Sequence, residues 1–456
     1  MVRLKELVYS ATCILGFLIS SSIAARNEGK FFHISDIHYD PQYGQGVYPQ
    51  ASSCAVQVDV AEFPLGNYDC DSPWSLVEAT LKTMADSESA ADFIVWTGDT
   101  PGALAQDLLP NTTVLEIIQN ASRAIEDRFP NLPVFPAIGN HDNWPRHLLE
   151  PQPNAFRDAL GQVWASWLAD YSGALDTFSQ GGYYVTAINA NLSVISLNTA
   201  FYYYKDTRVE GLDDPAGQFV WLEEKLEDAE NDGVVVYIVA HILPGSLEGE
   251  TLKSFQPRFN ERYLDILRRF SHVIKGQFYG HHHYDSFRVL YAEDGTPVNA
   301  LYVQPSLTPR NATALGPRNP SFRVVSYDRA TGDVLDIEQY YLDLANSQLT
   351  WELEYRATTS YGVSDLSPAS LDALIEKFSE GEAASNEIFR RYHGHSTALA
   401  DVKECDDDCR RYHFCAITNL DYDKYDDCLS GHAVRKGGQI GSLGATIFVL
   451  LYNLLS

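Results

Sequence analysis

Residues 31–40 of the chain read FFHISDIHYD, an apolar run that leads into an aspartate and a histidine one residue apart. Aromatic and β-branched side chains dominate residues 31–35, which favours a buried strand. The polar residues Asp36 and His38 follow at the carboxyl end of that strand. In open α/β sheets, ligands bind beyond the carboxyl ends of the strands. The stretch therefore predicts a core strand that delivers a carboxylate and an imidazole to a binding site.

Four further apolar runs have the same design and cover residues 93–97, 133–138, 234–240 and 273–279. The polar residues that follow them are, in order, Asp99, then Asn140, His141 and Asp142, then His241, and finally His281 and His283. Stretches with helical character lie between the runs, at residues 74–84, 114–129 and 215–229. This alternation of strands and helices predicts a layered α/β fold.

Two other regions contribute to the expected fold without a chemical role. Residues 154–171 carry apolar side chains at helical spacing, which indicates core packing. A loop rich in Pro, Gly and Asn covers residues 305–320, and further strands are expected at 321–327 and 337–344. We expect the catalytic sheets to finish there.

The polar residues at the five strand ends share one chemical property, because carboxylates, imidazoles and carboxamide oxygens all bind divalent metals. Singly, each has an ordinary structural interpretation as part of a turn, a loop or a packed core. Together they argue for a site, since separate strand ends all supply ligand groups and glycines precede three of them, at Gly98, Gly139 and Gly280. Glycine permits tight turns immediately before such residues.

The order of these motifs, D-x-H, G-D, G-N-H-D, H and G-H-x-H, resembles the signature of the calcineurin-like metallophosphoesterases. More narrowly, residues 32–40, 138–142 and 240–245 and the C-terminal cysteines resemble acid sphingomyelinase-like phosphodiesterases. The resemblance implies a four-layer α/β/β/α sandwich that hydrolyses phosphodiesters with metal-activated water. Purple acid phosphatases are similar, but they carry a tyrosine where this chain has Gly102 and a glycine where it has His38, so no ferric site is expected.

The resemblance also implies a role for each residue of the centre. One metal would be held by Asp36, His38, Asp99 and His283, and the other by Asp99, Asn140, His241 and His281. Imidazole and oxygen ligands without thiolate suit two divalent metal ions, with zinc as the expected metal. His141 is expected to act as the general acid, and Asp142 either orients it or caps the following turn. His282 is expected to face substrate or solvent, and Asp285 to support the ligands.

The expected substrate is a small phosphodiester or a nucleotide phosphate. In acid sphingomyelinase itself a saposin-like domain precedes the catalytic domain, whereas here the first motif follows the expected leader by about a dozen residues. A sphingomyelin or phospholipid phosphodiesterase is therefore the alternative, and a catalytically idle surface binding protein is a second one. The complete set of ligands together with His141 weighs against the idle alternative.

Residues 1–25 have the layout of a secretory signal peptide, with basic residues, an apolar stretch and a small-residue end. Removal of this segment leaves six cysteines, an even set typical of the oxidising secretory route. Many connectivities are possible, and proximity favours Cys54 with Cys70, Cys405 with Cys409, and Cys415 with Cys428. Four N-glycosylation sequons fit the same route, at Asn111, Asn120, Asn191 and Asn311.

The catalytic domain is expected to span residues 26–363, and a helical, cysteine-containing C-terminal subdomain residues 364–430. Residues 431–456 resemble a glycosylphosphatidylinositol (GPI) anchor signal, with a frayed apolar terminus as the alternative. We thus expect a monomer that is secreted or held at the membrane by a lipid anchor, with the lysosomal lumen as another compartment. The net charge of −28 repels polyanions and argues against nucleic-acid binding.

Overall fold

The computed structural model describes residues 27–45, 54, 58–87, 90–103, 110–168, 171–310, 316–382, 386–395, 397 and 405–431. The expected signal peptide, the expected anchor signal beyond its first residue and the sequon at Asn311 lie outside these residues. Within them, no helix combines the length and the apolar character needed to cross a bilayer.

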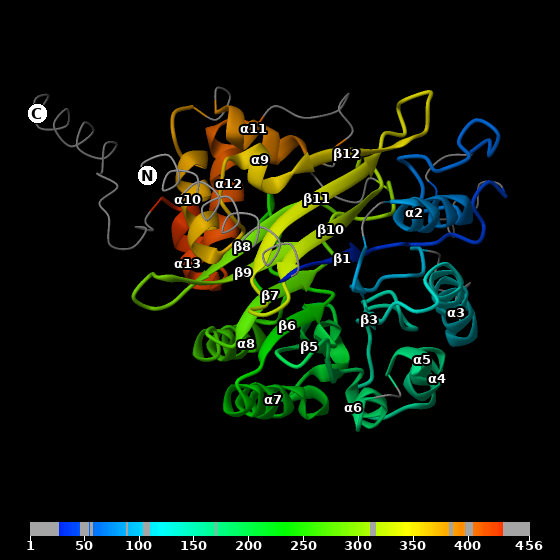
Figure 1. Cartoon of the computed structure of the whole chain (residues 1–456), viewed down its shortest axis with the longest axis horizontal. Coiled ribbons are helices and arrows are strands. Elements are labelled where there is room, and N and C mark those ends of the chain that lie inside the picture. Colours follow the sequence, from blue (N-terminus) through cyan, green and yellow to red (C-terminus); the bar gives the residue numbers. More distant parts are fainter. Residues whose placement is uncertain are drawn as a thin grey trace, which may run out of the picture.

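The described residues form two six-stranded sheets, and the apolar start of FFHISDIHYD lies in β1 (Glu28–Ile34), near the centre of the first sheet (Figure 1). Its order is β12 (Trp351–Arg356), β11 (Val334–Leu342), β10 (Ser321–Asp328), β1, β2 (Phe93–Trp96) and β3 (Val134–Pro136). Strands β1, β2 and β3 run parallel, so their carboxyl ends share one edge. The sheet continues beyond the expected end at residue 344, because β12 pairs with β11.

The second sheet has the order β4 (Tyr184–Ala187), β5 (Leu192–Leu197), β6 (Val235–Ala240), β7 (Ile274–Tyr279), β9 (Pro297–Val303) and β8 (Ser286–Tyr291). Strands β5, β6, β7 and β9 are parallel neighbours. The sequence predicted β6 and β7, whereas β4, β5, β8 and β9 were not predicted.

Side-chain alternation along β1 explains the stacking of layers. Phe31 packs on Phe93 in its own sheet and on Phe278 in the other, in the core between the sheets. Phe32 and Ile34 face the helices instead. The helices α2 (Trp74–Asp86) and α3 (Asn111–Arg128) cover the first sheet, and α7 (Gln218–Asp232) and α8 (Pro257–Arg269) cover the second (Figure 1). The expected four-layer α/β/β/α sandwich is confirmed.

The segment 154–171 forms two short helices, α4 (Ala155–Val163) and α5 (Ala165–Leu168), and α6 (Ala174–Gly181) follows. Helix α4 begins where the side chain of Asn154 accepts a hydrogen bond from the amide of Arg157. Of the apolar residues at helical spacing, Leu160 is buried in the core, and the others are partly buried against it: Phe156, Val163, Trp167 and Tyr171. The short turns η2 (Thr199–Tyr202), η3 (Thr207–Val209) and η4 (Pro215–Gly217) connect β5 to α7.

In the part of the chain that the structure describes, five helices follow β12: α9 (Ala357–Tyr361), α10 (Pro368–Phe378), α11 (Glu387–Gly394), α12 (Asp407–Thr418) and α13 (Tyr422–Leu429). Helices α10 and α12 pack on β8 and β9, whereas α9 lies against β11 and β12 (Figure 1). Leu371 and Leu374 of α10 join the core between the sheets. All three expected disulfides are present, two of them in this helical region. The boundary at residue 364 stays a prediction.

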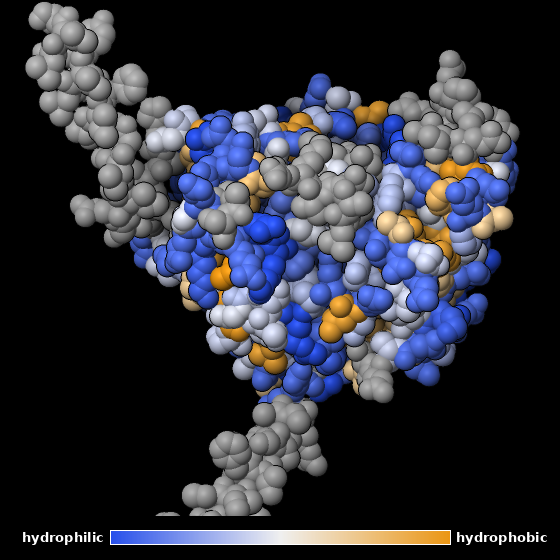
Figure 2. All heavy atoms as spheres, turned by 90° about the horizontal axis from the view of Figure 1, so that it is seen from above, coloured by the Kyte–Doolittle hydropathy of each residue, from blue (hydrophilic) through white to orange (hydrophobic). Residues whose placement is uncertain are grey.

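The face drawn in Figure 2 is mostly hydrophilic, with smaller hydrophobic areas between the hydrophilic ones. The large hydrophobic side chains that are exposed in the described residues come from different elements: Val60, Tyr204, Val220, Leu252 and Leu353. Single exposed hydrophobic residues of this kind are normal for a protein in water.

Candidate metal centre

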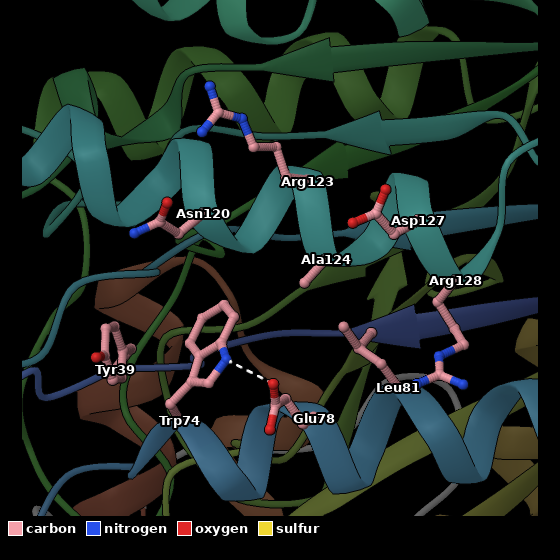
Figure 3. A pocket seen from close by; sticks show the side chains of 9 residues that line it. All are labelled: Tyr39, Trp74, Glu78, Leu81, Asn120, Arg123, Ala124, Asp127 and Arg128. Carbon is pink, nitrogen blue, oxygen red and sulfur yellow. Dashed lines mark hydrogen bonds between the residues drawn. The ribbon is translucent and has the colours of Figure 1, made fainter.

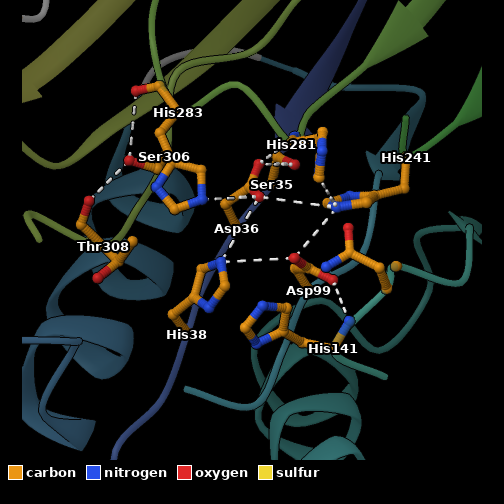
Figure 4. A network of polar contacts seen from close by, with 12 residues as sticks. Ser35, Asp36, His38, Asp99, His141, His241, His281, His283, Ser306 and Thr308 are labelled. Carbon is orange, nitrogen blue, oxygen red and sulfur yellow. Dashed lines mark hydrogen bonds and ion pairs between the residues drawn. The ribbon is translucent and has the colours of Figure 1, made fainter. Parts of the chain in front are cut away.

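The polar side chains at the strand ends meet at one point of the structure (Figure 4). Asp99 Oδ2 lies 3.1 Å from His241 Nε2, and Asp36 Oδ1 lies 3.3 Å from His283 Nε2. His38 joins these two pairs, because its Nε2 lies 3.5 Å from Asp99 Oδ2 and 3.7 Å from Asp36 Oδ1. The structure thus brings carboxylates from the first sheet together with imidazoles from the second.

Backbone hydrogen bonds between the strand-end loops explain this convergence. The amide of Asp36, after β1, donates to the carbonyl of Gly98, after β2, at 2.9 Å. The amide of Gly280, after β7, donates to the carbonyl of His241, after β6, at 3.0 Å. Between the sheets, the amide of His281 donates to Asp36 Oδ2 at 2.9 Å. The loops are therefore joined within each sheet and across the two.

The backbone is strained at five of the candidate ligands. Positive φ angles occur at Asp36 (50°), His38 (44°), Asp99 (56°), His281 (70°) and His283 (63°). Residues other than glycine rarely adopt this left-handed region, and each such conformation costs about 1–3 kcal/mol. Strain of this kind clusters at active sites, where the surrounding structure holds the residue in place.

Two of the motif glycines are required by close approach. A Cβ atom on Gly139 would lie 2.1 Å from Asp99 Oδ1. A Cβ atom on Gly280 would lie 1.9 Å from Ser35 Oγ and 2.6 Å from Asp36 Oδ2. Any larger residue would push the carboxylates out of the centre, which explains the glycines in the G-N-H-D and G-H-x-H motifs.

The carboxylates of Asp36 and Asp99 each direct one oxygen to the centre, because the other oxygen accepts hydrogen bonds from neighbouring groups. Asp36 Oδ2 accepts hydrogen bonds from Ser35 Oγ at 2.6 Å and from the amide of His281 at 2.9 Å. Asp99 Oδ1 accepts from the amide of His141 at 2.7 Å. Asp36 Oδ1 and Asp99 Oδ2 are therefore the oxygens that face the imidazoles.

His241 is fixed in one ring orientation, since its Nδ1 donates to the carbonyl of Thr97 at 2.7 Å. Its Nε2 faces Asp99. Burial alone would lower the pKa of His241, but the Asp99 carboxylate raises it to about 9. Burial would raise the carboxyl pKa values, but His241 holds the pKa of Asp99 far below its ordinary range, and His283 does the same for Asp36. Both carboxylates are therefore charged.

The donor atoms at this point fit divalent metal ions. Among the described residues, the buried atoms without a hydrogen-bond partner include Asp36 Oδ1, both ring nitrogens of His38, Asn140 Oδ1 and His283 Nδ1. Leaving such atoms unpaired costs about 1–3 kcal/mol each, so a ligand is the natural explanation. The candidates form three overlapping groups with atoms within 4.8 Å of one another: Asp36, His38 and His283; His38, Asp99 and His141; and Asp99, His241 and His281.

A residue that the sequence analysis missed, His147, fixes the carboxamide of Asn140. Its Nδ1 lies 3.0 Å from Asn140 Nδ2, and its amide donates to the Asn140 carbonyl at 2.8 Å. Burial lowers the pKa of His147 to about 4, so the neutral ring accepts and leaves Asn140 Oδ1 free. The sequence WPRH at residues 144–147 has no periodic pattern that would predict a role for His147. Its contact with Asn140 depends on the conformation of the turn over residues 140–147.

His141 lies beside the candidate ligands, with its ring centroid 4.7 Å from that of His38 and 5.3 Å from that of His147. Burial lowers its pKa well below the ordinary value, so the ring is neutral. The carboxylate of Asp142 holds backbone amides at 2.8 Å, those of Asp99, Thr100 and Gly139. These amides lie before Asp142 in the chain, so its carboxylate holds the turn at Gly139 and the loop after β2 and does not cap the following turn.

The expectation that His282 faces substrate or solvent is wrong, because the residue is only 1% exposed. Its Nε2 lies 3.3 Å from Ser254 Oγ, and its Nδ1 lies 3.4 Å from the hydroxyl of Tyr284. Ser254 lies in the chain after β6, so this segment packs against the His282 ring. Asp285 pairs with Arg323 of β10.

A buried carboxylate, Glu248, ties the chain after β6 to the C-terminal helices. It forms an ion pair with Arg288 at 2.8 Å and accepts hydrogen bonds from the hydroxyl of Tyr392 and from His413 Nδ1, each at 2.6 Å. Its own amide donates to the hydroxyl of Tyr284 at 2.6 Å, one residue after the G-H-x-H motif. The network therefore couples α11 and α12 to the loop with two candidate ligands.

A further group of metal-binding residue types lies outside this centre, at His393, Cys405 and His413. It offers no thiolate, because Cys405 is bonded to Cys409.

Comparison with known proteins gives matches over most of the chain. Residues 29–285 match the calcineurin-like phosphoesterase family, and residues 296–435 match the acid sphingomyelin phosphodiesterase C-terminal region. The Homo sapiens acid sphingomyelinase-like phosphodiesterase 3b is 36% identical over 427 residues, which cover 91% of this chain and 92% of that protein. The Mus musculus Cyclic GMP-AMP phosphodiesterase SMPDL3A is 37% identical over 429 residues, which cover 92% and 95%.

Among solved structures, a dimetal phosphatase from Danio rerio is similar with a TM-score of 0.41 and 10% identity, over 69% of this chain and 95% of that one. The sequence matches extend over both the catalytic motifs and the C-terminal helices. The chain therefore belongs to the acid sphingomyelinase-like phosphodiesterases, metal-dependent enzymes of the calcineurin-like phosphoesterase family.

Proposed function

We propose that the chain hydrolyses small phosphodiesters or nucleotide phosphates at a centre for two divalent cations. The observation that carries the proposal is the overlap of the ligand groups around Asp99. When bound, the two cations lower the pKa of a water molecule and neutralise the oxygens of the phosphoryl group. Zinc is the proposed metal, since imidazole and oxygen ligands without thiolate suit a redox-inert cation.

We assign one cation to Asp36, His38, Asp99 and His283 and the other to Asp99, Asn140, His241 and His281. Unpaired buried oxygens support this assignment at Asp36 and at Asn140. The bridging role of Asp99 is supported by its Oδ2, which lies 3.5 Å from a nitrogen assigned to the first cation and 3.1 Å from one assigned to the second.

His141 is the proposed general acid. Its ring shares a group with His38 and Asp99, and its buried Nδ1 has no hydrogen-bond partner among the described residues. In its imidazolium form this ring can donate a proton to the oxygen that leaves phosphorus, and the negative charge of a bound phosphodiester favours that form. The proposed role of Asp142 is to hold the turns that carry Asp99 and His141, through its bonds to their neighbouring amides.

Two guanidinium groups near the centre favour an anionic substrate. Arg146 lies on the turn between His141 and His147, and its buried Nε has no hydrogen-bond partner in the part of the chain described. Arg310 pairs with the buried Asp71 at 3.3 Å. Burial and the charge of Arg310 both lower the pKa of Arg146. A second anionic group on the substrate would form an ion pair with the Arg146 guanidinium, whereas the positive charge of a choline group would be repelled by it.

This local charge favours nucleotide phosphates over sphingomyelin within an otherwise acidic protein. The mouse relative is named for its action on Cyclic GMP-AMP, which is a nucleotide. Hydrolysis of sphingomyelin or another phospholipid is the second candidate, because the C-terminal region matches that of acid sphingomyelin phosphodiesterase.

The test compares kcat/KM of the purified protein for a nucleoside triphosphate, for bis(p-nitrophenyl) phosphate and for sphingomyelin in detergent. We expect Arg146→Gln to lower kcat/KM for the triphosphate about tenfold, the value of a charge-assisted hydrogen bond, and to leave bis(p-nitrophenyl) phosphate unchanged. Arg411→Gln, in a surface ion pair of α12, is the matched control. Preferred hydrolysis of sphingomyelin that persists in Arg146→Gln would overturn the substrate class.

We also propose that the protein is a secreted monomer with a signal peptide at 1–25, a catalytic domain at 26–363 and a C-terminal subdomain at 364–430. The three disulfides support an oxidising compartment.

The proposed exchange of residues 431–456 for a lipid anchor is tested by treating cells with a phosphatidylinositol-specific phospholipase, which should release the protein. Retention on the cells after this treatment would contradict the anchor.

A further inference from the structure

A groove between α2 and α3 lies outside the candidate metal centre (Figure 3). Its cavity is about 560 Å³, within the range of about 300–1,000 Å³ that is typical of small-molecule sites. The residues that line it include Tyr39, Trp74, Glu78, Asn120, Arg123 and Asp127. Figure 3 shows the indole of Trp74 rising from α2 toward α3, with Asn120 on the opposite wall.

The groove combines an aromatic platform with a charged rim. Trp74 is held in one orientation, since its Nε1 donates to Glu78 at 3.0 Å and its ring packs 5.1 Å from that of Tyr39. Arg123 and Asp127 of α3 stand on the other side. A sugar ring offers a C–H face that packs on an aromatic ring and hydroxyls that bond to charged groups, so this surface suits a carbohydrate.

The wall of the groove also carries an attachment point for a carbohydrate. Asn120 is the first residue of the acceptor triplet Asn-Ala-Ser, and its side chain is exposed. The sequon asparagines Asn111 and Asn191 are exposed too, but neither is among the residues that line the groove. Asn120 therefore differs from these two because a glycan attached there would begin inside a cavity.

We propose that an N-linked glycan on Asn120 folds into this groove, with its first N-acetylglucosamine residues packed on Trp74. In the attachment step, Asn120 Nδ2 forms a bond to sugar C1 and loses one proton, while the bond from C1 to the lipid-linked diphosphate breaks and the diphosphate leaves with its carrier. No oxidant or reductant is needed. The glycan is thereby an internal ligand of the fold and not only a surface modification.

This placement would also brace the catalytic side of the protein. Tyr39 follows the candidate ligand His38 directly, and its amide donates to the carbonyl of Thr100 at 2.7 Å. The amide of Gly102 donates in turn to the carbonyl of Tyr39 at 2.9 Å. A glycan that packs on Trp74 and Tyr39 therefore supports the loops after β1 and β2 from outside.

The experiment uses the full chain expressed in a eukaryotic secretory host, with mass spectrometry of glycopeptides. An amidase that removes N-glycans is applied to the folded protein, and release is followed at Asn120 and at Asn111. Asn111 is the first residue of α3 and serves as the internal control. We expect release at Asn120 to be at least about tenfold slower than at Asn111, because a groove-bound glycan must dissociate before cleavage. After unfolding, the two rates should be equal.

Two variants isolate the role of the indole. Trp74→Ala should bring the rate at Asn120 close to that at Asn111, whereas Trp74→Phe, which keeps an aromatic face, should retain most of the protection. The proposal is overturned by an unoccupied Asn120 in the secreted wild-type protein, by equal release at both sites in that protein, or by unchanged protection in Trp74→Ala. The wild-type comparison needs no variant, so a folding defect in Trp74→Ala does not remove the test.

Discussion

Replacing Glu248 with glutamine removes one charge from a buried network that joins the C-terminal helices to the metal centre. Glu248 is 1% exposed and lies 2.8 Å from the fully buried Arg288. Burial alone would raise its pKa, but Arg288 and His413 lower it from 4.5 to about 2. At about 1.36 kcal/mol per pKa unit, this difference corresponds to roughly 3 kcal/mol of stability. Removing one partner of a buried ion pair costs about 3–5 kcal/mol, so we expect a loss of about 3 kcal/mol.

The pH dependence of this loss has a definite sign. The pKa of Glu248 is lower in the folded protein than in the unfolded chain, so its stabilisation is fully present above about pH 4.5 and is lost as the pH falls toward 2. The difference in unfolding free energy between wild type and Glu248→Gln should therefore be constant around neutral pH and should narrow in acid.

Urea unfolding followed by tryptophan fluorescence at several pH values measures this difference. The matched control is Glu224→Gln, whose side chain is 62% exposed and pairs with Lys225, and which should change stability by less than about 0.5 kcal/mol. Equal stability of wild type and Glu248→Gln at pH 7, or a difference that grows in acid, would refute the reasoning.

Three further variants test other parts of the molecule. His141→Ala should keep its bound metal, measured by elemental analysis, but should lose about 10²-fold in kcat, because the leaving oxygen has no proton donor. His147→Ala should weaken binding of one of the two cations by about tenfold or more, measured by metal titration, because it frees the carboxamide of Asn140. Replacing Cys415 and Cys428 with serine should lower the free energy of unfolding by about 3 kcal/mol, measured in urea, because it opens the link between α12 and α13.

Each of these predictions has a contrary result. Normal kcat in His141→Ala would reject the assigned proton donor. Unchanged affinity for both cations in His147→Ala would mean that the Asn140 carboxamide needs no support. Equal unfolding curves with and without the Cys415–Cys428 bond would show that the C-terminal helices hold together by packing alone.

Local sequence pattern was sufficient to predict the strands that carry the centre. The runs before Asp36, Asp99 and His241 are short, apolar and buried on both faces, so they stand out from their surroundings. Strand β5 was harder to predict, because its sequence LSVISL alternates with serine and is not followed by a candidate ligand. Strand β12 carries alternating charges at the edge of its sheet and has only a weak apolar signal.

Contacts between distant segments could be predicted for the motif residues but not for residues outside the motifs. Glu248 meets Tyr392 and His413, which lie far along the chain in helices whose position depends on the whole fold. His282 shows the same limit, since the sequence did not predict that Ser254 and Tyr284 contact its ring. The contact of His147 with Asn140 depends on the conformation of one turn, and no periodic pattern in the sequence predicts it.

The central claim is that Asp99 joins two cations in one centre. Elemental analysis of the purified protein after exhaustive dialysis, together with Asp99→Asn and circular dichroism to verify its fold, tests this claim directly. If Asp99 joins two cations, we expect two divalent ions per chain in the wild type. Folded Asp99→Asn should hold fewer than one and should lose hydrolysis. Full activity in metal-free protein, or two tightly held ions in Asp99→Asn, would contradict it.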